Sequence, residues 1–184
     1  MKSVNRVVTI LSLLAVVFLT ACGGGGGDVA SSGGGSSLLA ASFSADEQNP
    51  GQNSVSLQEG SSSGNRVTVL VQVTDTVNLT GGTFDVTYDP ARFTYMGSSA
   101  GDLFESSGVT PIYGVNEPVS GHLVIGVGSA TAVGVNGAET LIRLSFRADA
   151  QGSGQVVLDL ADLLGASGQA VPGVAWFGGT LIGT

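Results

Sequence analysis

The side chains of this chain that could act as acids, bases or nucleophiles are few and widely spaced. Its only histidine is His122. Residues 97–101, GSSAG, fit the G-x-S-x-G pattern of a nucleophilic serine on a strand–turn–helix, but no helical pattern follows and only His122 could serve as the base. Glycosidases place two carboxylates across a cleft. Asp159 and Asp162 are close in the sequence, yet nothing around them indicates a cleft. The sequence therefore predicts no catalytic residue, and we expect a protein that is not an enzyme.

Metal and cofactor sites find equally little support. Zinc sites usually need several Cys or His ligands, whereas the chain has one of each. Calcium takes about six to eight oxygen ligands, and the chain has no D-x-D-x-D-G loop to supply them. We therefore expect no metal site and no cofactor, and the many carboxylates leave a structural calcium ion near a loop as the alternative.

The only cysteine, Cys22, follows an N-terminal segment with the pattern of a secretory signal peptide. Lys2 and Arg6 form a basic start, and residues 7–21 are apolar apart from three hydroxyl side chains. This run is shorter than the ~20 apolar residues of a transmembrane helix. We therefore expect residues 1–21 to be removed as a signal peptide.

The end of this segment, Leu19-Thr20-Ala21-Cys22, resembles the bacterial lipobox. The resemblance implies cleavage before Cys22 and a diacylglyceryl group on its sulfur; an ordinary signal peptide with a chance cysteine is the alternative. Two or three acyl chains hold a protein firmly on a bilayer. Gly23 follows Cys22, and not the aspartate that retains lipoproteins in the inner membrane of some bacteria. We therefore expect a lipoprotein anchored at the outer membrane, on its periplasmic side or at the cell surface.

Residues 22–41 are rich in Gly and Ser, and they predict a flexible, lipidated tether before a single domain over residues 42–184. Without residues 1–21 the chain has four arginines, no lysine and fourteen acidic residues, a formal charge of −10. Such an acidic domain offers no basic patch to nucleic acid or to anionic lipid headgroups. We therefore expect no nucleic-acid partner, and no membrane contact besides the acyl chains.

Apolar and polar residues alternate along most of residues 42–184, and Gly, Asn, Asp and Pro separate the alternating runs. Alternation with a period of two places one face of a strand in a core. The pattern predicts an all-β fold, a nine-stranded antiparallel β-sandwich. Residues 159–166 come nearest to a helix, of one or two turns at most. The expected strands are residues 54–58, 66–74, 81–88, 92–97, 109–115, 121–128, 139–148, 154–160 and 172–182.

Several of these segments, in this order, resemble a cohesin domain. Residues 66–97 contain an apolar strand, a Gly-Gly turn and a strand that ends in Tyr-Asp-Pro. Residues 101–104, GDLF, and the strand within residues 134–148 follow as they do in the family. The resemblance covers roughly residues 54–184. It implies a jelly-roll topology, related to that of some carbohydrate-binding modules, and it implies dockerins as partners, which are small calcium-loaded helical modules on polysaccharide-degrading enzymes.

The resemblance further implies a non-catalytic module that binds a protein through the outward face of strand 81–88. That face presents Gly81, Thr83, Asp85 and Thr87, and the first two stand where the best-known cohesins carry an Asn and an Asp. Its residues are small or polar, and such a flat face suits protein docking better than sugar stacking.

Two other functions stay open at this point. A carbohydrate-binding module of polysaccharide catabolism needs exposed aromatic rings, and the candidates outside the inward phases are Tyr95, Tyr113 and Trp176. A structural surface protein or adhesin is the second alternative.

Overall fold

A computed structural model describes residues 38–184 of the chain. The predictions of a signal peptide and of a lipid on Cys22 lie outside the described residues. The described residues form one compact unit. In chain order its elements are β1 (Ala41–Ala45), β2 (Ser54–Ser63), β3 (Arg66–Thr74), β4 (Thr76–Thr87), β5 (Phe93–Ala100), α1 (Leu103–Ser106), β6 (Pro111–Val119), β7 (His122–Ser129), β8 (Val135–Gly137), β9 (Thr140–Ala148), β10 (Gly152–Gly165), β11 (Ala175–Phe177) and β12 (Gly179–Gly183).

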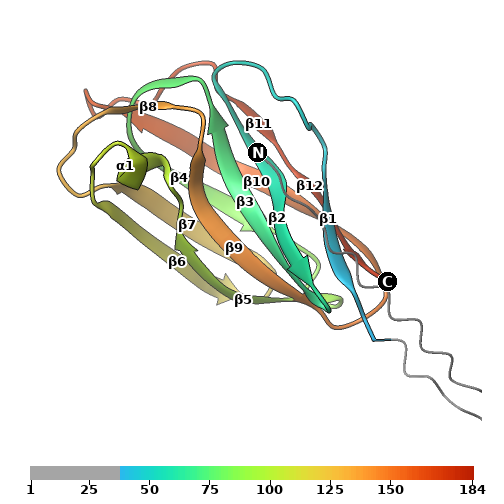
Figure 1. Ribbon diagram of the computed structural model, residues 1–184. Coiled ribbons are helices and arrows are strands. Elements are labelled where there is room, and N and C mark those ends of the chain that lie inside the picture. The colour runs from blue at the N-terminus through green and yellow to red at the C-terminus, as the bar shows by residue number, and fades with distance from the viewer. Residues whose placement is uncertain (1–37) are drawn as a thin grey trace, which may run out of the picture. The chain divides into compact units, whose positions relative to one another are not determined.

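Two sheets pack face to face as a sandwich (Figure 1). The larger sheet has the strand order β1-β12-β10-β4-β7-β6, with β8 paired to β4, and the smaller one has the order β11-β2-β3-β9-β5. Strands distant in the sequence are neighbours in both sheets, so the connections cross between the layers. All pairs are antiparallel except β11 with β2. The predicted all-β sandwich is confirmed.

The prediction of nine strands was too low, because the described residues contain twelve. Two short strands, β1 and β8, were not predicted, and the expected strand 172–182 is divided into β11 and β12. The chain changes sheets at Gly178, since β11 pairs with β2 while β12 pairs with β1 and β10. Only glycine fits there, because a Cβ would lie 2.3 Å from the carbonyl oxygen of Val156. Residues 159–165 are not helical but continue β10 through a bulge.

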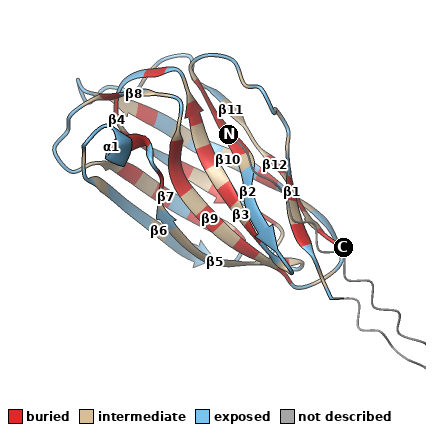
Figure 2. Ribbon diagram, in the orientation of Figure 1, coloured by how far each residue is buried: buried red, intermediate tan, exposed pale blue. Residues whose placement is uncertain are grey.

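The alternating apolar positions form the core between the sheets. The four valines of β3, at positions 67, 69, 71 and 73, are at most 2% exposed, as their spacing predicts. Phe146 is fully buried, and its ring makes edge-on contacts with Tyr88 and Tyr95 at centroid distances of 5.2 and 5.9 Å. Buried residues alternate with others along the central strands, whereas β6 has no buried residue (Figure 2).

The Gly-Asp-Leu-Phe segment closes one end of the core. Leu103 and Phe104 are 1% exposed and enter the core from the short helix α1. Asp102 accepts a hydrogen bond from the guanidinium of Arg143, which also donates to the carbonyl of Ala100. Gly101 packs so tightly on β9 that a Cβ would lie 2.0 Å from the carbonyl oxygen of Thr140. These contacts therefore hold the segment between β5 and β6 against β9.

The Tyr-Asp-Pro segment forms a corner at the end of β4. The Asp89 side chain accepts a hydrogen bond from the N–H of Ala91 at 2.9 Å, which closes the turn after β4. Tyr88 ends the inward phase of β4, and its hydroxyl donates to Glu117 Oε1 at 2.5 Å. The same carboxylate oxygen accepts from the N–H of Gly121. The corner thus ties the end of β4 to the β6–β7 hairpin.

This environment gives a testable pH dependence. Burial and the hydrogen bond to Glu117 raise the pKa of Tyr88 to about 12, whereas a tyrosine of the unfolded chain ionises near 10. The unfolded state therefore loses its proton first, so the stabilisation is complete below pH ~10 and is lost as the pH rises toward 12. We expect ultraviolet absorbance to show one tyrosine that ionises only near pH 12, and this step should be missing in Tyr88→Phe. A tyrosine titration near pH 10 that Tyr88→Phe removes would contradict the assignment.

Both ends of the described chain lie at one end of the sandwich. Ala40 and Thr184 exchange two backbone hydrogen bonds of 2.9 and 3.0 Å beside the β1–β12 pair (Figure 1). From there β10 runs to Leu164, opposite Gly81. Twelve residues of strand at about 3.3 Å each put that far end roughly 40 Å away. Within the described residues, no helix has the length and hydrophobicity to cross a bilayer.

Candidate functional site: the outer face of the larger sheet

The outward residues of β10, β4, β7 and β6 form an open face with four rows across the strands. Residues that pair directly in an antiparallel sheet lie on the same side, so the register defines each row. We call this surface the docking face. Its rows, in the strand order β10, β4, β7 and β6, are Leu164–Gly81–Gly128–Ile112, Asp162–Thr83–Gly126–Gly114, Asp159–Asp85–Val124–Asn116 and Val157–Thr87–His122–Val119.

The predicted partner-binding residues lie together on β4, the second of the four strands of this face. Thr83 and Thr87 are exposed and Asp85 is half-buried, as their outward phase requires. Gly81 is buried, because its neighbours on β7 approach closely: a Cβ would lie 2.6 Å from the carbonyl oxygen of Val127. The structure therefore brings all four residues onto one surface, although Gly81 contributes only backbone.

Carboxylates dominate the β10 side of the docking face. Asp85 and Asp159 are directly opposite each other, and Asp162 lies opposite Thr83. Like charges in opposite positions of a sheet are unfavourable, so this arrangement does not serve the stability of the fold. His122 Nε2 lies 2.7 Å from Asp85 Oδ2, so the histidine of this face is engaged by a carboxylate. No arginine side chain belongs to the four rows.

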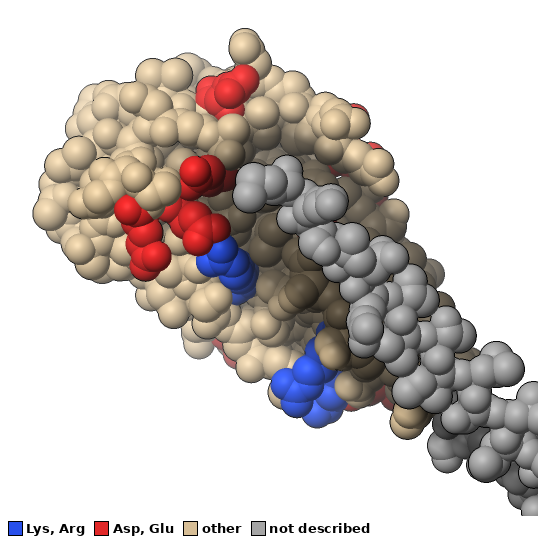
Figure 3. Space-filling view, viewed as in Figure 1, with Lys and Arg blue, Asp and Glu red and all other residues tan. Residues whose placement is uncertain are grey.

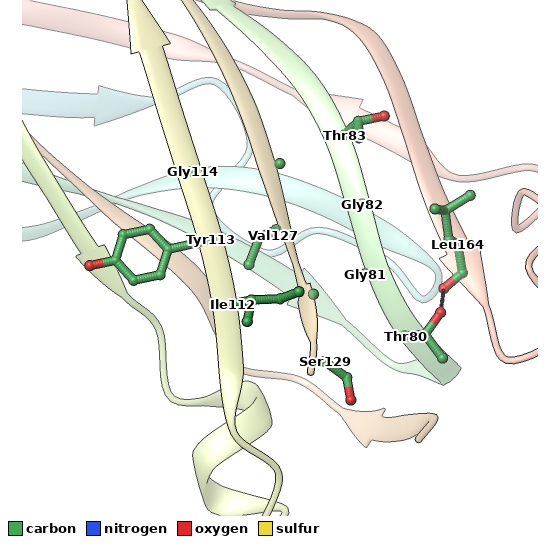
Figure 4. A pocket seen from close by; sticks show the side chains of 12 residues that line it. Thr80, Gly81, Gly82, Thr83, Ile112, Tyr113, Gly114, Val127, Ser129 and Leu164 are labelled. Carbon is green, nitrogen blue, oxygen red and sulfur yellow. Dashed lines mark hydrogen bonds between the residues drawn. The ribbon is translucent and has the colours of Figure 1, made fainter. Parts of the chain in front are cut away.

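A shallow groove of about 350 Å³ occupies the two rows at the end of the face that is remote from the chain termini. Gly81, Gly126 and Gly128 form its floor, and Ile112 and Leu164 stand at its sides. Thr80 donates a hydrogen bond to the carbonyl of Leu164 at 3.0 Å and so joins the end of β4 to β10 (Figure 4). The groove is therefore an apolar depression with a backbone floor.

The three aromatic candidates for sugar stacking do not form a row. Trp176 is on β11 and packs against Phe84 of the core with ring centroids 5.9 Å apart. Tyr95 is at the opposite edge of the smaller sheet, where burial raises the pKa of its hydroxyl. Tyr113 is 45% exposed, but its ring extends from β6 away from the groove (Figure 4). These positions offer no flat aromatic platform.

The outer face of the smaller sheet carries most of the positive charge. Arg66 and Arg147 are directly opposite each other on β3 and β9, and Arg143 follows on the same side of β9. Figure 3 looks onto this side and shows arginine side chains with carboxylates beside them. Hydrogen bonds from Arg147 and Thr94 lower the pKa of Asp149. On this side of the domain, arginines therefore form surface ion pairs with carboxylates of the same domain.

The G-x-S-x-G motif has no catalytic geometry. Ser99 lies within β5 and pairs with Arg143 of β9, not on a turn before a helix. His122 is on the other sheet and is bound to Asp85. Over residues 38–184, no group of three or more His, Cys, Asp or Glu side chains could hold a metal ion.

Sequence reasoning missed the contributions of β6, β7 and β10 to the docking face. A period of two shows which residues of a strand point outward, but not which strand lies beside it. Gly126 and Gly128 on β7, with Gly114 on β6, carried a detectable signal, because glycines two residues apart are unusual inside strands. Pairing the β6–β7 hairpin from its turn would have placed these three glycines together.

Comparisons with known proteins support a single family. The cohesin domain family matches residues 51–170. No curated protein matches the chain. A type II cohesin domain from the cellulosome of Acetivibrio cellulolyticus is similar in structure, with a TM-score of 0.58 and 15% identity over 72% of this chain and 95% of that chain.

Two further solved structures extend this similarity. A non-cellulosomal cohesin from the hyperthermophilic archaeon Archaeoglobus fulgidus has a TM-score of 0.54 and 16% identity, covering 68% of this chain and 88% of that chain. The sixth cohesin of the A. cellulolyticus scaffoldin B, in complex with a mutant Cel5 dockerin, has a TM-score of 0.54 and 20% identity over 67% of this chain and 96% of that chain. Because the family match spans well over half of the residues and the sandwich agrees with it, this chain belongs to the cohesin domain family.

Proposed function

We propose that this protein is a non-catalytic docking module, anchored to a membrane by a lipid on Cys22, that binds a dockerin-type module of another protein through the docking face. The family match over residues 51–170 carries the proposal. A similar solved structure is a cohesin in complex with a dockerin. The open face of β10, β4, β7 and β6 supplies a flat surface of strands that no other element of residues 38–184 covers.

The position of the docking face suits a module on a tether. The chain enters the domain beside its C-terminal residues, at the end of the sandwich where β10 begins. The groove and Thr83 lie toward the other end of β4. A partner on this surface would therefore bind at a distance from the point at which the tether joins the domain.

Glycan binding is the weaker candidate. It requires aromatic rings that share one exposed surface, and Trp176, Tyr95 and Tyr113 are on three separate edge strands, two of the smaller sheet and one of the larger. The groove has a floor of glycine backbone, which offers no ring face to a sugar. A protein partner uses backbone and apolar contacts of this kind readily.

Charge reversal on the docking face tests the proposal. We expect Thr83→Lys combined with Asp85→Lys to weaken the capture of a dockerin module at least about 100-fold, because two long cations would stand on a flat contact surface and His122 would lose its partner. Titration of purified protein against a panel of dockerin modules measures this, with circular dichroism to show that the sandwich persists.

A control makes the same change of charge elsewhere. Thr68 lies on the outer face of β3 and Glu105 is exposed on α1, so Thr68→Lys with Glu105→Lys should leave capture unchanged. Failure of every dockerin module to bind, or capture that survives the changes at Thr83 and Asp85, would contradict the proposed function.

Lipid anchoring has its own test. Cys22→Ser removes the sulfur that would receive the diacylglyceryl group, so we expect the full-length variant to move from the membrane fraction to the soluble fraction. With the acyl chains gone, an acidic chain retains no attraction for anionic headgroups. Fractionation of cells that express either form measures the change. Membrane association that persists in Cys22→Ser would show that something other than this lipid holds the protein.

A further inference from the structure

The strand orders of the two sheets end in four edge strands, and three of these are protected within residues 38–184. On β1, the carboxylate of Glu59 accepts the N–H of Phe43 at 2.8 Å. The strand β11 is only three residues long. On β5, a bulge interrupts the ladder, and the hydroxyl of Tyr88 accepts the N–H of Tyr95 at 3.3 Å. Such protection is common, because a free edge is a template for another strand.

The fourth edge strand, β6, is long, apolar and free along one side (Figure 1). It has nine residues and no lysine or arginine. Three of its large apolar side chains, those of Ile112, Tyr113 and Val119, are 45–66% exposed. Among the described residues, only β7 pairs with it. A long, exposed and apolar edge strand is a site at which a further strand can pair.

The hydrogen-bond pattern identifies the free backbone groups of β6. The N–H of Ala130 donates to the carbonyl of Thr110 at 3.0 Å, directly before the first residue pair of β6 and β7. Bonded pairs alternate along an antiparallel ladder, so the even-numbered residues in the regular part of β6 bond to β7. The N–H and C=O groups of Tyr113 and Val115 therefore point away from β7, and no hydrogen bond joins them to another of the described residues. Pro111 fits this phase, because the N–H that it lacks would face solvent.

Two prolines limit pairing to a short stretch that is symmetric about its centre. Pro111 and Pro118 donate no hydrogen bond, so a regular ladder is confined to the residues between them. Gly114 lies near the middle of this stretch, with Tyr113 and Val115 on either side. Free groups placed equally about a centre pair antiparallel with an identical stretch. The edge is therefore complementary to itself.

We propose that β6 pairs antiparallel with the β6 of a second copy of this chain, about a twofold axis at Gly114. In this register Tyr113 of each copy lies opposite Val115 of the other, and their free groups exchange about four hydrogen bonds. An aromatic residue opposite a β-branched one stabilises a ladder. The interface is isologous, so it closes at a dimer.

The dimensions of the edge predict a weak dimer. Nine residues at about 3.3 Å each span roughly 30 Å, and two layers about 10 Å apart are roughly 20 Å thick with their side chains. Each copy would bury about 600 Å², which puts the total near 1,200 Å², at the lower end of specific interfaces. We therefore expect a dissociation constant in the micromolar range.

The dimer would carry two docking faces on the same side. A twofold axis perpendicular to a continuous sheet exchanges the copies without turning either sheet over. The docking faces stay open, because the contact uses an edge of the sheet. Dimerisation goes beyond the proposed docking function and does not depend on it.

Sedimentation of the lipid-free variant Cys22→Ser tests the inference. We expect a monomer–dimer equilibrium at micromolar concentrations. Adding Tyr113→Lys should weaken the dimer at least about tenfold, because it places two like charges near the axis and lysine protects edge strands. Val77→Lys is the matched control: it replaces an apolar residue of β4 that is 73% exposed, and it should leave the dimer unchanged. Circular dichroism shows whether each variant keeps the sandwich.

A cysteine at the axis tests the register. Residues directly opposite in a ladder have Cα atoms about 4.5–5.5 Å apart, within the range of a disulfide. Cys22→Ser removes the only native cysteine. In this background Gly114→Cys should form a covalent dimer with oxidised glutathione as the oxidant. Gly51→Cys, at an open position outside β6, should stay largely monomeric under the same conditions.

The outcomes decide the inference without reference to dockerins. A protein that sediments as a monomer throughout, or a dimer that Tyr113→Lys leaves intact, would overturn it. Cross-linking of Gly114→Cys no greater than that of Gly51→Cys would overturn the pairing about Gly114. Because no docking partner is present in these measurements, failure of the docking function would leave the dimer standing, and the reverse also holds.

Discussion

Replacing Gly101 with valine is expected to destabilise the domain by about 3 kcal/mol or more, in the upper part of the range for overpacked positions. A Cβ on Gly101 would lie 2.0 Å from the carbonyl oxygen and 2.4 Å from the carbonyl carbon of Thr140. These are backbone atoms of β9, which cannot rotate away as a flexible side chain would. The N–H of Gly101 also donates to the carbonyl of Leu141, so the segment cannot retreat without losing that hydrogen bond.

Urea denaturation followed by circular dichroism measures this loss. Gly126→Val is the control, because the same side chain enters open space there and no loss of stability is expected. Equal stability of Gly101→Val and the wild-type protein would show that the close approach between this segment and β9 does not exist in solution. The Gly-Asp-Leu-Phe motif is thus explained by packing, not by binding.

Replacing Phe146 with alanine is expected to lower the free energy of unfolding by about 3–5 kcal/mol, as for other fully buried phenylalanines. Phe146 of β9 is 0% exposed, and its ring contacts Tyr88 and Tyr95. Alanine would leave a cavity between the two sheets, since strands paired on both sides cannot collapse freely. With a total stability of about 5–15 kcal/mol, the variant would lose a large share of it.

The neighbouring residue provides the control for this measurement. Ser145 precedes Phe146 on β9 but points outward, so Ser145→Ala should change the stability by no more than about 0.5 kcal/mol. Chemical denaturation of the three proteins gives the comparison. A small effect of Phe146→Ala, similar to that of Ser145→Ala, would contradict the assignment of the inward phase.

Much of the fold could be predicted from the sequence, because burial follows a local rule. Alternation along residues 66–74 specifies which side chains enter the core, and the structure buries those valines. The Asp89 turn was likewise predictable, since its hydrogen bond joins residues two apart. Strands β1 and β8 escaped prediction because they are short and owe their existence to pairing with partners distant in the chain.

By itself, the sequence determined the all-β class, the inward phases of the long strands and the cohesin resemblance. It also placed Gly81, Thr83, Asp85 and Thr87 on one outward face. Only the tertiary structure decided which strands lie beside that face, and so joined Asp159 of β10 to Asp85 of β4. The physical reason is that a strand's own residues fix its two faces, whereas its neighbours are chosen by long-range pairing across the whole sandwich. The groove and its acidic edge exist only through that pairing.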